Sequence, residues 1–170
     1  MPLLYCHLPT PLGEMLAIAS ERGMCLLEFI GQQGVEREQA QVEAARGGPA
    51  RAGMNAILEQ TRTELAEYFA GKRRQFEVPL DLVGTPFQND AWQALRAIPY
   101  GQTRSYASQA RAIGRPTATR AVAAANGQNK VSIIVPCHRV IGSDGSLTGF
   151  GGGLPRKQAL LALEGEGSLI

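Results

Sequence analysis

The segment Val83-Gly84-Thr85-Pro86 divides the sequence into two parts with different residue patterns. Short apolar runs separated by turn residues precede it and are typical of strands, whereas apolar residues recur at helical spacing after it. Threonine is a favoured N-cap and proline a favoured first helical residue, so a helix is predicted to begin at Pro86. With 170 residues, the chain can form two small domains, which we expect at residues 1–83 and 84–170.

The first part is predicted to form a small antiparallel sheet and one firm helix. Apolar runs at residues 3–8, 14–20 and 23–30 are separated by turn signals that contain proline or glycine. Apolar side chains recur at helical spacing within residues 54–69, and this helix is expected to pack on the sheet. The remaining segments are predicted to be a loop or weak helix at 32–51 and an extended connector at 76–82.

The second part contains two closely spaced helical segments. Residues 105–113 and 116–126 are joined only by Gly114-Arg115, which is the spacing of a helix-turn-helix. Many short helix pairs have no nucleic-acid role, so the pair alone leaves a packing role open. On the second helix, small side chains around Arg120 would form a low surface that could approach a DNA groove without reading much sequence. These are Ala118, Ala121, Ala124 and Ala125.

Further elements are predicted around these helices. Residues 86–98 and 154–164 are typical of amphipathic helices, and 131–135 of a short strand that Pro136 ends. Residues 141–147 contain an Asp-Gly turn and are predicted to form a hairpin, a small wing beside the helix pair.

The net charge of +2 conceals an uneven distribution. Residues 1–83 carry 8 Lys or Arg against 11 Asp or Glu, whereas residues 84–170 carry 9 against 4. A basic half favours a polyanionic partner such as DNA, because Lys and Arg that neutralise phosphates release counterions. A solvated surface that only keeps the chain dispersed explains the charge equally well.

Cys137 and His138 place a thiol and an imidazole side by side at the end of an apolar run. A free thiol is only a few per cent thiolate at pH 7, so a nucleophilic cysteine needs a nearby base or cation. His138 is the candidate base in the second part, and Glu164 is an acid that could orient it. Spacing alone still favours a structural cysteine.

Zinc binding is the competing use of the thiols. The set Cys6, His7, Cys25, Cys137 and His138 contains no CxxC or HxxxH pair, so the spacing disfavours a zinc site. We expect no metal and no cofactor, since residues 149–153 lack the pattern of a phosphate-binding loop.

The start of the sequence predicts neither a signal peptide nor a membrane-spanning helix. No basic segment precedes its apolar residues, and prolines interrupt them. A cytoplasmic protein with reduced thiols and no membrane partner is therefore expected.

Several motifs together resemble the O6-alkylguanine-DNA alkyltransferases, also called methylated-DNA–protein-cysteine methyltransferases. The IVPCHRV sequence is the most specific, and the motifs occur in the family's order along nearly the whole chain. They are Thr10–Gly13, Tyr68–Gly71, Thr85–Gln88 with Trp92, Ile98–Gly101, Ser105-Tyr106, Arg120–Val122, Asn126-Gly127 with Asn129, Ile134–Val140 and Thr148–Leu154.

The resemblance implies an α/β (α+β) protein with a ribonuclease-H-like first domain and a helix-turn-helix second domain. It also implies single-turnover DNA repair, in which an alkyl group passes from O6-alkylguanine, and from O4-alkylthymine, to the protein's own cysteine. The implied partner is double-stranded DNA containing alkylated guanine, bound by a monomer that could be cooperative on DNA.

The family pattern also implies roles for single residues. Cys137 would accept the alkyl group, His138 would reach it through water, and Glu164 would stand behind His138. Asn129 would brace the turn before the cysteine, and Tyr106 would lie beside the flipped nucleotide.

Further residues are implied for the DNA and the guanine. Arg120 would replace the extruded base in the stack while its helix lies in the minor groove. The implied DNA contacts are Arg120, Thr119, Ala121, Tyr106 and Ser105, and the implied pocket residues are Val140, Phe150, Gly151 and Gly152.

Four positions depart from common family members. Phe150 stands where tyrosine is common, Gly151 where some members have serine, and Thr119 where alanine is frequent. The changes at Phe150 and Gly151 predict an altered affinity rather than a lost reaction, because a ring face and a backbone donor remain. Gly152 replaces a bulky aromatic residue of some members and predicts room for alkyl groups larger than methyl.

Two other functions stay in competition. A non-catalytic alkyltransferase-like protein would bind the lesion without reacting, but such relatives lack the cysteine that is present here. A thiol hydrolase would turn over repeatedly, whereas an alkyltransferase would react once per molecule.

Overall fold

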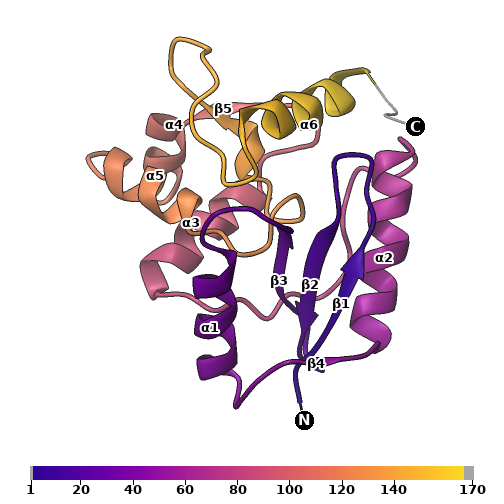
Figure 1. The fold of residues 1–170 in the computed structure, drawn as a ribbon. Coiled ribbons are helices and arrows are strands. Elements are labelled where there is room, and N and C mark those ends of the chain that lie inside the picture. The colour runs from indigo at the N-terminus through magenta and orange to yellow at the C-terminus, as the bar shows by residue number, and fades with distance from the viewer. Residues whose placement is uncertain (1, 167–170) are drawn as a thin grey trace. The chain divides into compact units, whose positions relative to one another are not determined.

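The computed structural model describes residues 2–166, which divide into two compact units at the bond between Val83 and Gly84 (Figure 1). The first unit contains a small sheet with helices, and the second is mainly helical. This arrangement confirms the predicted α/β (α+β) class.

The first unit is built on a four-stranded sheet with the order β3-β2-β1-β4. β1 (Leu4–Leu8) pairs antiparallel with β2 (Met15–Ala19), which pairs antiparallel with β3 (Met24–Phe29). These strands confirm the three predicted apolar runs. The edge strand β4 (Arg51–Ala52) runs parallel to β1 and is not anticipated by the sequence, because its two exposed residues form no apolar pattern.

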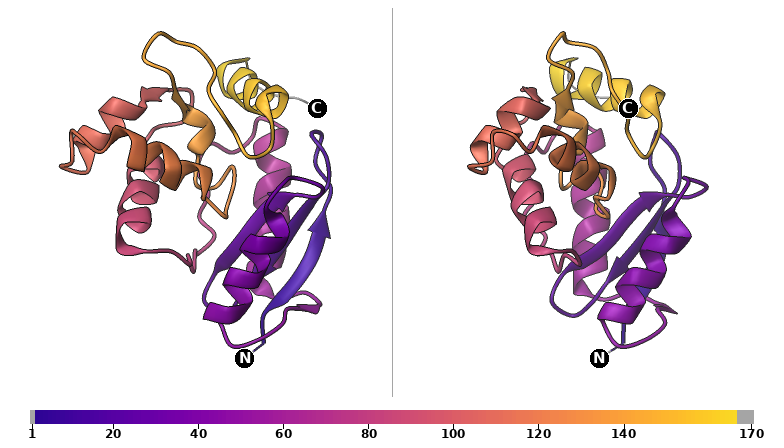
Figure 2. Two further views of the ribbon diagram at one scale, coloured as in Figure 1. Left: turned by 60° about the vertical axis from the view of Figure 1, so that its left-hand side comes forward. Right: turned by 90° about the vertical axis from the view of Figure 1, so that its left-hand side faces the viewer.

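Two helices, α1 (Val35–Ala45) and α2 (Ala56–Phe69), cover opposite faces of this sheet (Figure 2). Successive strand residues point to opposite faces, so paired residues of neighbouring strands share one face. The pair Tyr5 and Ile18 faces α1, whereas the next pair, Cys6 and Ala17, faces the other side.

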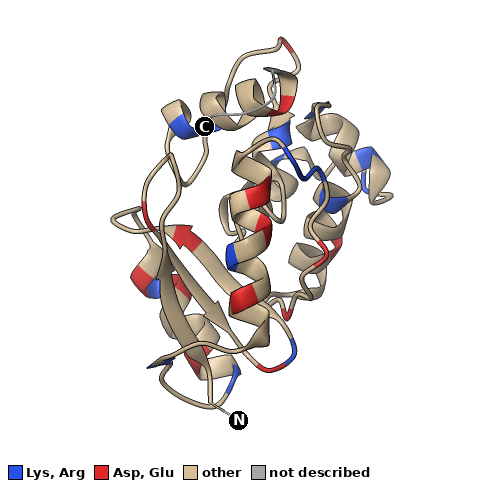
Figure 3. Ribbon diagram, turned by 90° about the vertical axis from the view of Figure 1, so that its right-hand side faces the viewer, with Lys and Arg blue, Asp and Glu red and all other residues tan. Residues whose placement is uncertain are grey.

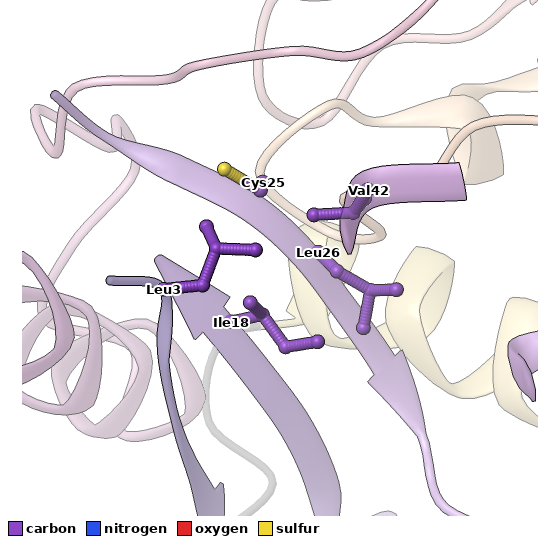
Figure 4. Close-up of a cluster of buried hydrophobic side chains, with 5 residues drawn as sticks. All are labelled: Leu3, Ile18, Cys25, Leu26 and Val42. Atoms are coloured by element: carbon purple, nitrogen blue, oxygen red, sulfur yellow. The ribbon is translucent and has the colours of Figure 1, made fainter. Parts of the chain in front are cut away.

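The face toward α1 is held by a cluster of buried apolar side chains (Figure 4). Val42 supplies the contribution of α1, although residues 32–51 show no clear periodicity in sequence. Burying an aliphatic side chain contributes about 1.5–3 kcal/mol, which can fix a helix that has only weak intrinsic preference. The cluster consists of Leu3, Ile18, Cys25, Leu26 and Val42.

Asp81 anchors the extended connector of the first unit. The backbone around it pairs with β3, because Met24 N donates to Pro79 O at 2.9 Å and Asp81 N donates to Met24 O at 2.9 Å. Arg46 donates from Nε and Nη2 to the Asp81 carboxylate at 3.0 and 2.9 Å, and Ser20 Oγ donates to it at 2.6 Å. The predicted extended connector is confirmed, and its carboxylate ties it to α1 and β2.

Ser20 and Cys25 both adjoin this carboxylate. The Cys25 thiol lies 3.8 Å from the Asp81 Oδ2 atom. Within residues 2–166, no three Cys, His, Asp or Glu side chains group in a way that could hold a metal ion. The Asp81 carboxylate is instead neutralised by Arg46.

The second unit begins with α3 (Pro86–Arg96), as predicted. Thr85 Oγ1 accepts a hydrogen bond from Gln88 N at 3.1 Å, and Gln88 Oε1 accepts one from Thr85 N at 2.9 Å. This reciprocal capping box satisfies backbone donors at the helix start. The final helix, α6 (Leu154–Glu166), also follows the prediction.

Two short helices, α4 (Tyr106–Ala112) and α5 (Thr119–Gly127), form the central pair. The second helix begins three residues later than predicted. Pro116 lies in the connection, which closes through a hydrogen bond from Ala118 N to Arg115 O at 2.9 Å. The predicted exposed alanine surface is wrong at Ala125, which is buried.

Buried polar groups fix α5 against α3 and α4. Trp92 Nε1 donates to Ala125 O at 2.9 Å. The side-chain amides of Gln109 and Asn126 exchange hydrogen bonds of 2.9 and 2.8 Å. Because each buried group is satisfied, these bonds hold α5 in one position and rotation.

Residues before and after the thiol depart from the predicted strands. The strand predicted at 131–135 is wrong, because Val135 N donates to Val131 O at 3.0 Å and closes a turn. The Asp-Gly turn within 141–147 is present, with Gly142 N donating to Ser146 O at 2.9 Å. Instead of the expected hairpin, β6 (Val140–Ile141) pairs parallel with β5 (Arg104–Ser105). None of the helices in residues 2–166 combines the length and apolar character needed to cross a bilayer.

We expect Asp81→Asn to lower the free energy of unfolding by about 1–2 kcal/mol at pH 7, because it weakens charged hydrogen bonds that are partly exposed. Burial raises the pKa of Asp81, but the hydrogen bonds of Arg46 and Ser20 and the charge of Arg46 outweigh it and hold the pKa below its ordinary value. This stabilisation is present above the unfolded-state pKa of about 3.9 and is lost as the pH falls through the folded-state pKa.

Urea unfolding of the wild type and the variant at pH 7 and pH 3 measures this difference, which should shrink at the lower pH. The matched control is Glu59→Gln, since Glu59 and Arg62 are paired but about half exposed, at 51% and 54%. It should change stability by less than about 0.5 kcal/mol. An Asp81 effect that grows as the pH falls would contradict the expectation.

Candidate active site

Cys137 lies at the start of a short 3-10 helix, η1 (Cys137–Arg139), directly after the turn at 131–135. The turn contains Ile133 with a φ of 73°, a left-handed conformation that is unfavourable for a β-branched residue. Ile133 is buried at 1% exposure, so packing maintains the strain. The turn, rather than a strand end, leaves the Cys137 thiol half-buried.

Asn129 fastens this turn to the thiol. Its Oδ1 accepts from Val131 N at 3.0 Å, and its Nδ2 donates to Val135 O at 2.8 Å. The same Nδ2 donates to Cys137 Sγ at 3.3 Å. A donor aimed at sulfur stabilises its negative charge, so Asn129 can favour the thiolate as well as brace the turn.

The two residues that follow Cys137 in η1, His138 and Arg139, share one carboxylate. His138 Nε2 lies 2.7 Å from Glu164 Oε2, and both side chains are fully buried. Arg139 donates to both Glu164 oxygens, from Nε at 2.8 Å and from Nη2 at 3.0 Å. Arg139 Nη1 also donates to Ile98 O at 2.8 Å. Glu164 therefore ties α6 to η1.

The charges in this cluster follow from burial and pairing. Burial raises the pKa of Glu164, but the hydrogen bonds and charges of His138 and Arg139 outweigh it and hold the pKa far below its ordinary value. Burial lowers the pKa of His138 more than Glu164 raises it. At neutral pH, Arg139 and Glu164 form the ion pair, and His138 is neutral.

The hydrogen bond to Glu164 decides which nitrogen of His138 can act as a base. An ionised carboxylate only accepts, so the proton of the neutral ring is assigned to Nε2. The Nδ1 atom then carries the lone pair, and it is buried without a hydrogen-bond partner among the described residues. It can accept the proton of a nearby thiol, directly or through a water molecule.

Cys137 opens onto a cavity of about 540 Å³ formed within the second unit. Such a volume is within the range of ligand pockets and can hold a nucleobase. The predicted pocket residues Phe150 and Gly151 line it, whereas Val140 and Gly152 are not among its lining residues. The wall is formed by Tyr106, Ala123, Asn126, Gly127, Cys137, Thr148, Gly149, Phe150 and Gly151.

The residues implied for DNA contact lie at the starts of α4 and α5. Arg120 and Ala121 are exposed, whereas Thr119 is half-buried. Ser105 is the N-cap of α4, and its hydroxyl accepts from Ser108 N at 3.0 Å. Arg120 thus projects from a low surface, whereas the Ser105 hydroxyl is already engaged in capping.

Sequence reasoning missed two basic residues of the site, Arg139 and Lys157, and the hydroxyl group of Thr148 at the cavity wall. The position of Arg139 directly after His138 could have indicated that it belongs to the site. Lys157 gave no such indication, because it looks like an ordinary polar residue of an amphipathic helix. Lys157 is completely buried, and its Nζ donates to Val140 O at 2.7 Å and to Thr148 O at 3.1 Å. It joins the two ends of the segment that follows η1.

A half-buried thiol next in sequence to a histidine that an acid orients is typical of proteins that use cysteine as a nucleophile. Two family descriptions match nearly the whole chain: "6-O-methylguanine DNA methyltransferase, ribonuclease-like domain" at residues 3–82 and "6-O-methylguanine DNA methyltransferase, DNA binding domain" at residues 86–166. The chain belongs to the 6-O-methylguanine DNA methyltransferase family.

Relatives agree with this membership. A methylated-DNA–protein-cysteine methyltransferase of Methanosarcina acetivorans is 40% identical over 164 residues, which cover 96% of this chain and 99% of that protein. One of Mycolicibacterium paratuberculosis is 59% identical over 101 residues, which cover 59% of this chain and 61% of that relative's length. The crystal structure of Mycobacterium tuberculosis OGT in complex with DNA superposes with a TM-score of 0.82 at 41% identity, covering 96% of this chain and 94% of that one.

We expect Glu164→Ala to lower the free energy of unfolding by about 3–5 kcal/mol, because it leaves the buried Arg139 without a counter-charge. Urea denaturation of the two proteins measures the change. Glu164→Gln keeps the shape and an acceptor, and should be less harmful. Asp90→Ala removes an exposed acid of the same unit and should stay within about 0.5 kcal/mol. A loss below 1 kcal/mol for Glu164→Ala would contradict the assigned role.

Proposed function

We propose that the chain repairs DNA by transferring an alkyl group from O6-alkylguanine, and from O4-alkylthymine, to its own Cys137. The observation that carries the proposal is the half-buried thiol at the wall of a base-sized cavity, followed directly in the chain by the buried His138, which pairs with Glu164. Family membership supports the same reaction.

The thiol loses its proton to His138 Nδ1, while Glu164 holds the ring and stabilises the imidazolium that forms. Asn129 Nδ2 stabilises the thiolate from its distance of 3.3 Å. The sulfur then attacks the alkyl carbon. A sulfur–carbon bond forms, the carbon–O6 bond breaks, and its electron pair remains on guanine. The thioether product has no carbonyl that water could attack, so each molecule acts once.

The cavity requires the damaged nucleotide to leave the DNA stack. An alkyl carbon inside a duplex is out of reach, and flipping the nucleotide costs a few kcal/mol. The Arg120 side chain can fill the gap, as intercalating side chains do when they enter from the minor groove. Once flipped, the base can contact the ring of Phe150 and the backbone of Gly151, while Tyr106 hydrogen-bonds the guanine or its phosphate.

We assign the helix-turn-helix role to α4 and α5. The first backbone N–H groups of α5 have no side-chain cap and can bind a phosphate. Exposed arginines outnumber exposed acids in this unit, where Lys and Arg are blue and Asp and Glu red in Figure 3. The exposed arginines are Arg96, Arg104, Arg111, Arg115 and Arg120. The partner is double-stranded DNA that contains alkylated guanine.

A cytoplasmic location suits this chemistry, because a nucleophilic thiol must stay reduced. None of the three cysteines, all of which lie within residues 2–166, forms a disulfide bond. We propose a monomer, and cooperative binding along DNA would appear as a sigmoidal binding isotherm.

The central test mixes the protein with a duplex containing one O6-methylguanine and follows the peptides by mass spectrometry. We expect one methyl group on Cys137 per molecule and unmodified guanine in the DNA, with a burst equal to the protein added. Cys137→Ser should bind the duplex without transfer. Repeated turnover would favour a thiol hydrolase, and binding without methylation of the wild type would favour a non-catalytic lesion-binding protein.

Arg120→Ala should reduce the rate of repair of duplex DNA by about ten- to hundredfold, because the flipped state loses about 1–3 kcal/mol of stabilisation. Transfer from free O6-methylguanine base needs no extrusion and should change by less than about twofold. Arg37→Ala removes the same charge from the first unit and controls for net charge. Equal losses with duplex and free base would argue against the extrusion role.

A further inference from the structure

Two hydroxyl groups meet at the wall of the Cys137 cavity. Tyr106 Oη and Thr148 Oγ1 lie 2.5 Å apart, and either can be the donor. Both residues line the cavity, Tyr106 from the start of α4 and Thr148 from the segment before α6. The family resemblance gives a role to Tyr106 but none to the side chain of Thr148.

Other contacts hold both residues of this hydrogen bond in place. Tyr106 directly follows β5, whose residue Ser105 pairs with Ile141 of β6 and also caps α4. The backbone carbonyl of Thr148 accepts from the buried Lys157 Nζ at 3.1 Å. The short contact is therefore fixed by the sheet on one side and by a buried ammonium group on the other.

The direction of the hydrogen bond determines what Tyr106 can offer to a bound base. A phenol hydroxyl has one proton and two lone pairs. If Tyr106 donates to Thr148, its proton is used. If Thr148 donates to Tyr106, the phenol proton is free to point into the cavity, and the chain of two hydrogen bonds is mutually strengthened.

We propose that Thr148 is a positioning residue that donates its hydroxyl proton to Tyr106, so that the Tyr106 proton faces the departing guanine or its phosphate. The role rests on the proposed alkyl transfer. As the Cys137 sulfur–carbon bond forms and the carbon–O6 bond breaks, the electron pair left on guanine raises its negative charge. The hydrogen bond from Tyr106 stabilises this charge, and neither tyrosine nor threonine is consumed.

Single-turnover transfer from duplex O6-methylguanine tests the role. Thr148→Val keeps the shape and removes the hydroxyl, and we expect a three- to tenfold lower rate at saturating DNA with a half-saturating concentration unchanged within about twofold. Thr148→Ser restores a hydroxyl and should recover most of the rate. In a Tyr106→Phe background, Thr148→Val should have no further effect.

Controls separate this role from a structural one. Ser146→Ala removes an exposed hydroxyl of the same segment, one that donates to Asp144 Oδ1 at 2.7 Å, and should leave transfer unchanged. Alkylation of Cys137 by iodoacetamide should be equal in wild type and Thr148→Val, because it does not involve guanine. Equal slowing of both reactions would show a structural defect and overturn the role.

Other outcomes are equally decisive. Faster transfer by Thr148→Val would mean that Thr148 competes as an acceptor for the Tyr106 proton, which overturns the proposal. If Thr148→Val slows transfer equally in the wild-type and the Tyr106→Phe backgrounds, the proposal is also overturned. If the wild type transfers no methyl group, the proposed function fails as well, whereas equal transfer by wild type and Thr148→Val overturns the role of Thr148 alone.

Discussion

The buried carboxylate of Glu164 is the interaction on which the site depends. It binds His138 and Arg139 together, and Arg139 extends the connection to the carbonyl of Ile98 beyond α3. A buried ion pair contributes little net stability, because desolvation offsets most of its attraction. Its value is geometric, since one arrangement of α6, η1 and the end of α3 satisfies every donor, and that arrangement leaves His138 Nδ1 free to accept a proton.

Much of the fold could be predicted from local patterns. The three strands of the first unit could be predicted from apolar runs separated by turn residues, and the start of α3 at Pro86 from its capping residues. The helix α1 was predicted only as a loop or weak helix, because Val42 is buried by contacts with residues distant in sequence. The edge strand β4 was not predicted, because its two residues are exposed and form no apolar pattern. The later start of α5 was not predicted either, because residues 115–118 form a turn closed by the hydrogen bond from Ala118 N to Arg115 O before the helix begins.

Part of the candidate site could be predicted from the sequence, because reactive residue types occur there within family motifs. Cys137, His138 and Glu164 could be named from residue types and family motifs, but their geometry could not. The left-handed Ile133 turns an apolar run into a turn, and no periodicity signals such a conformation. Lys157 could not be identified either, because a lysine on an amphipathic helix is ordinarily solvated, and its burial depends on two carbonyl groups that the fold brings to it.

The two-residue ladder between β5 and β6 has a consequence for how such a protein can diversify. The ladder pairs Arg104 with Val140 and Ser105 with Ile141. It therefore positions together Tyr106, which follows β5, and η1 with Cys137, which precedes β6. The helices α4 and α5 lie in the stretch of chain that this ladder spans. Substitutions on the outer faces of these helices can therefore alter which partner surface the protein recognises. The separation between the Tyr106 phenol and the Cys137 sulfur is kept, because it is set by backbone hydrogen bonds that do not depend on those side chains.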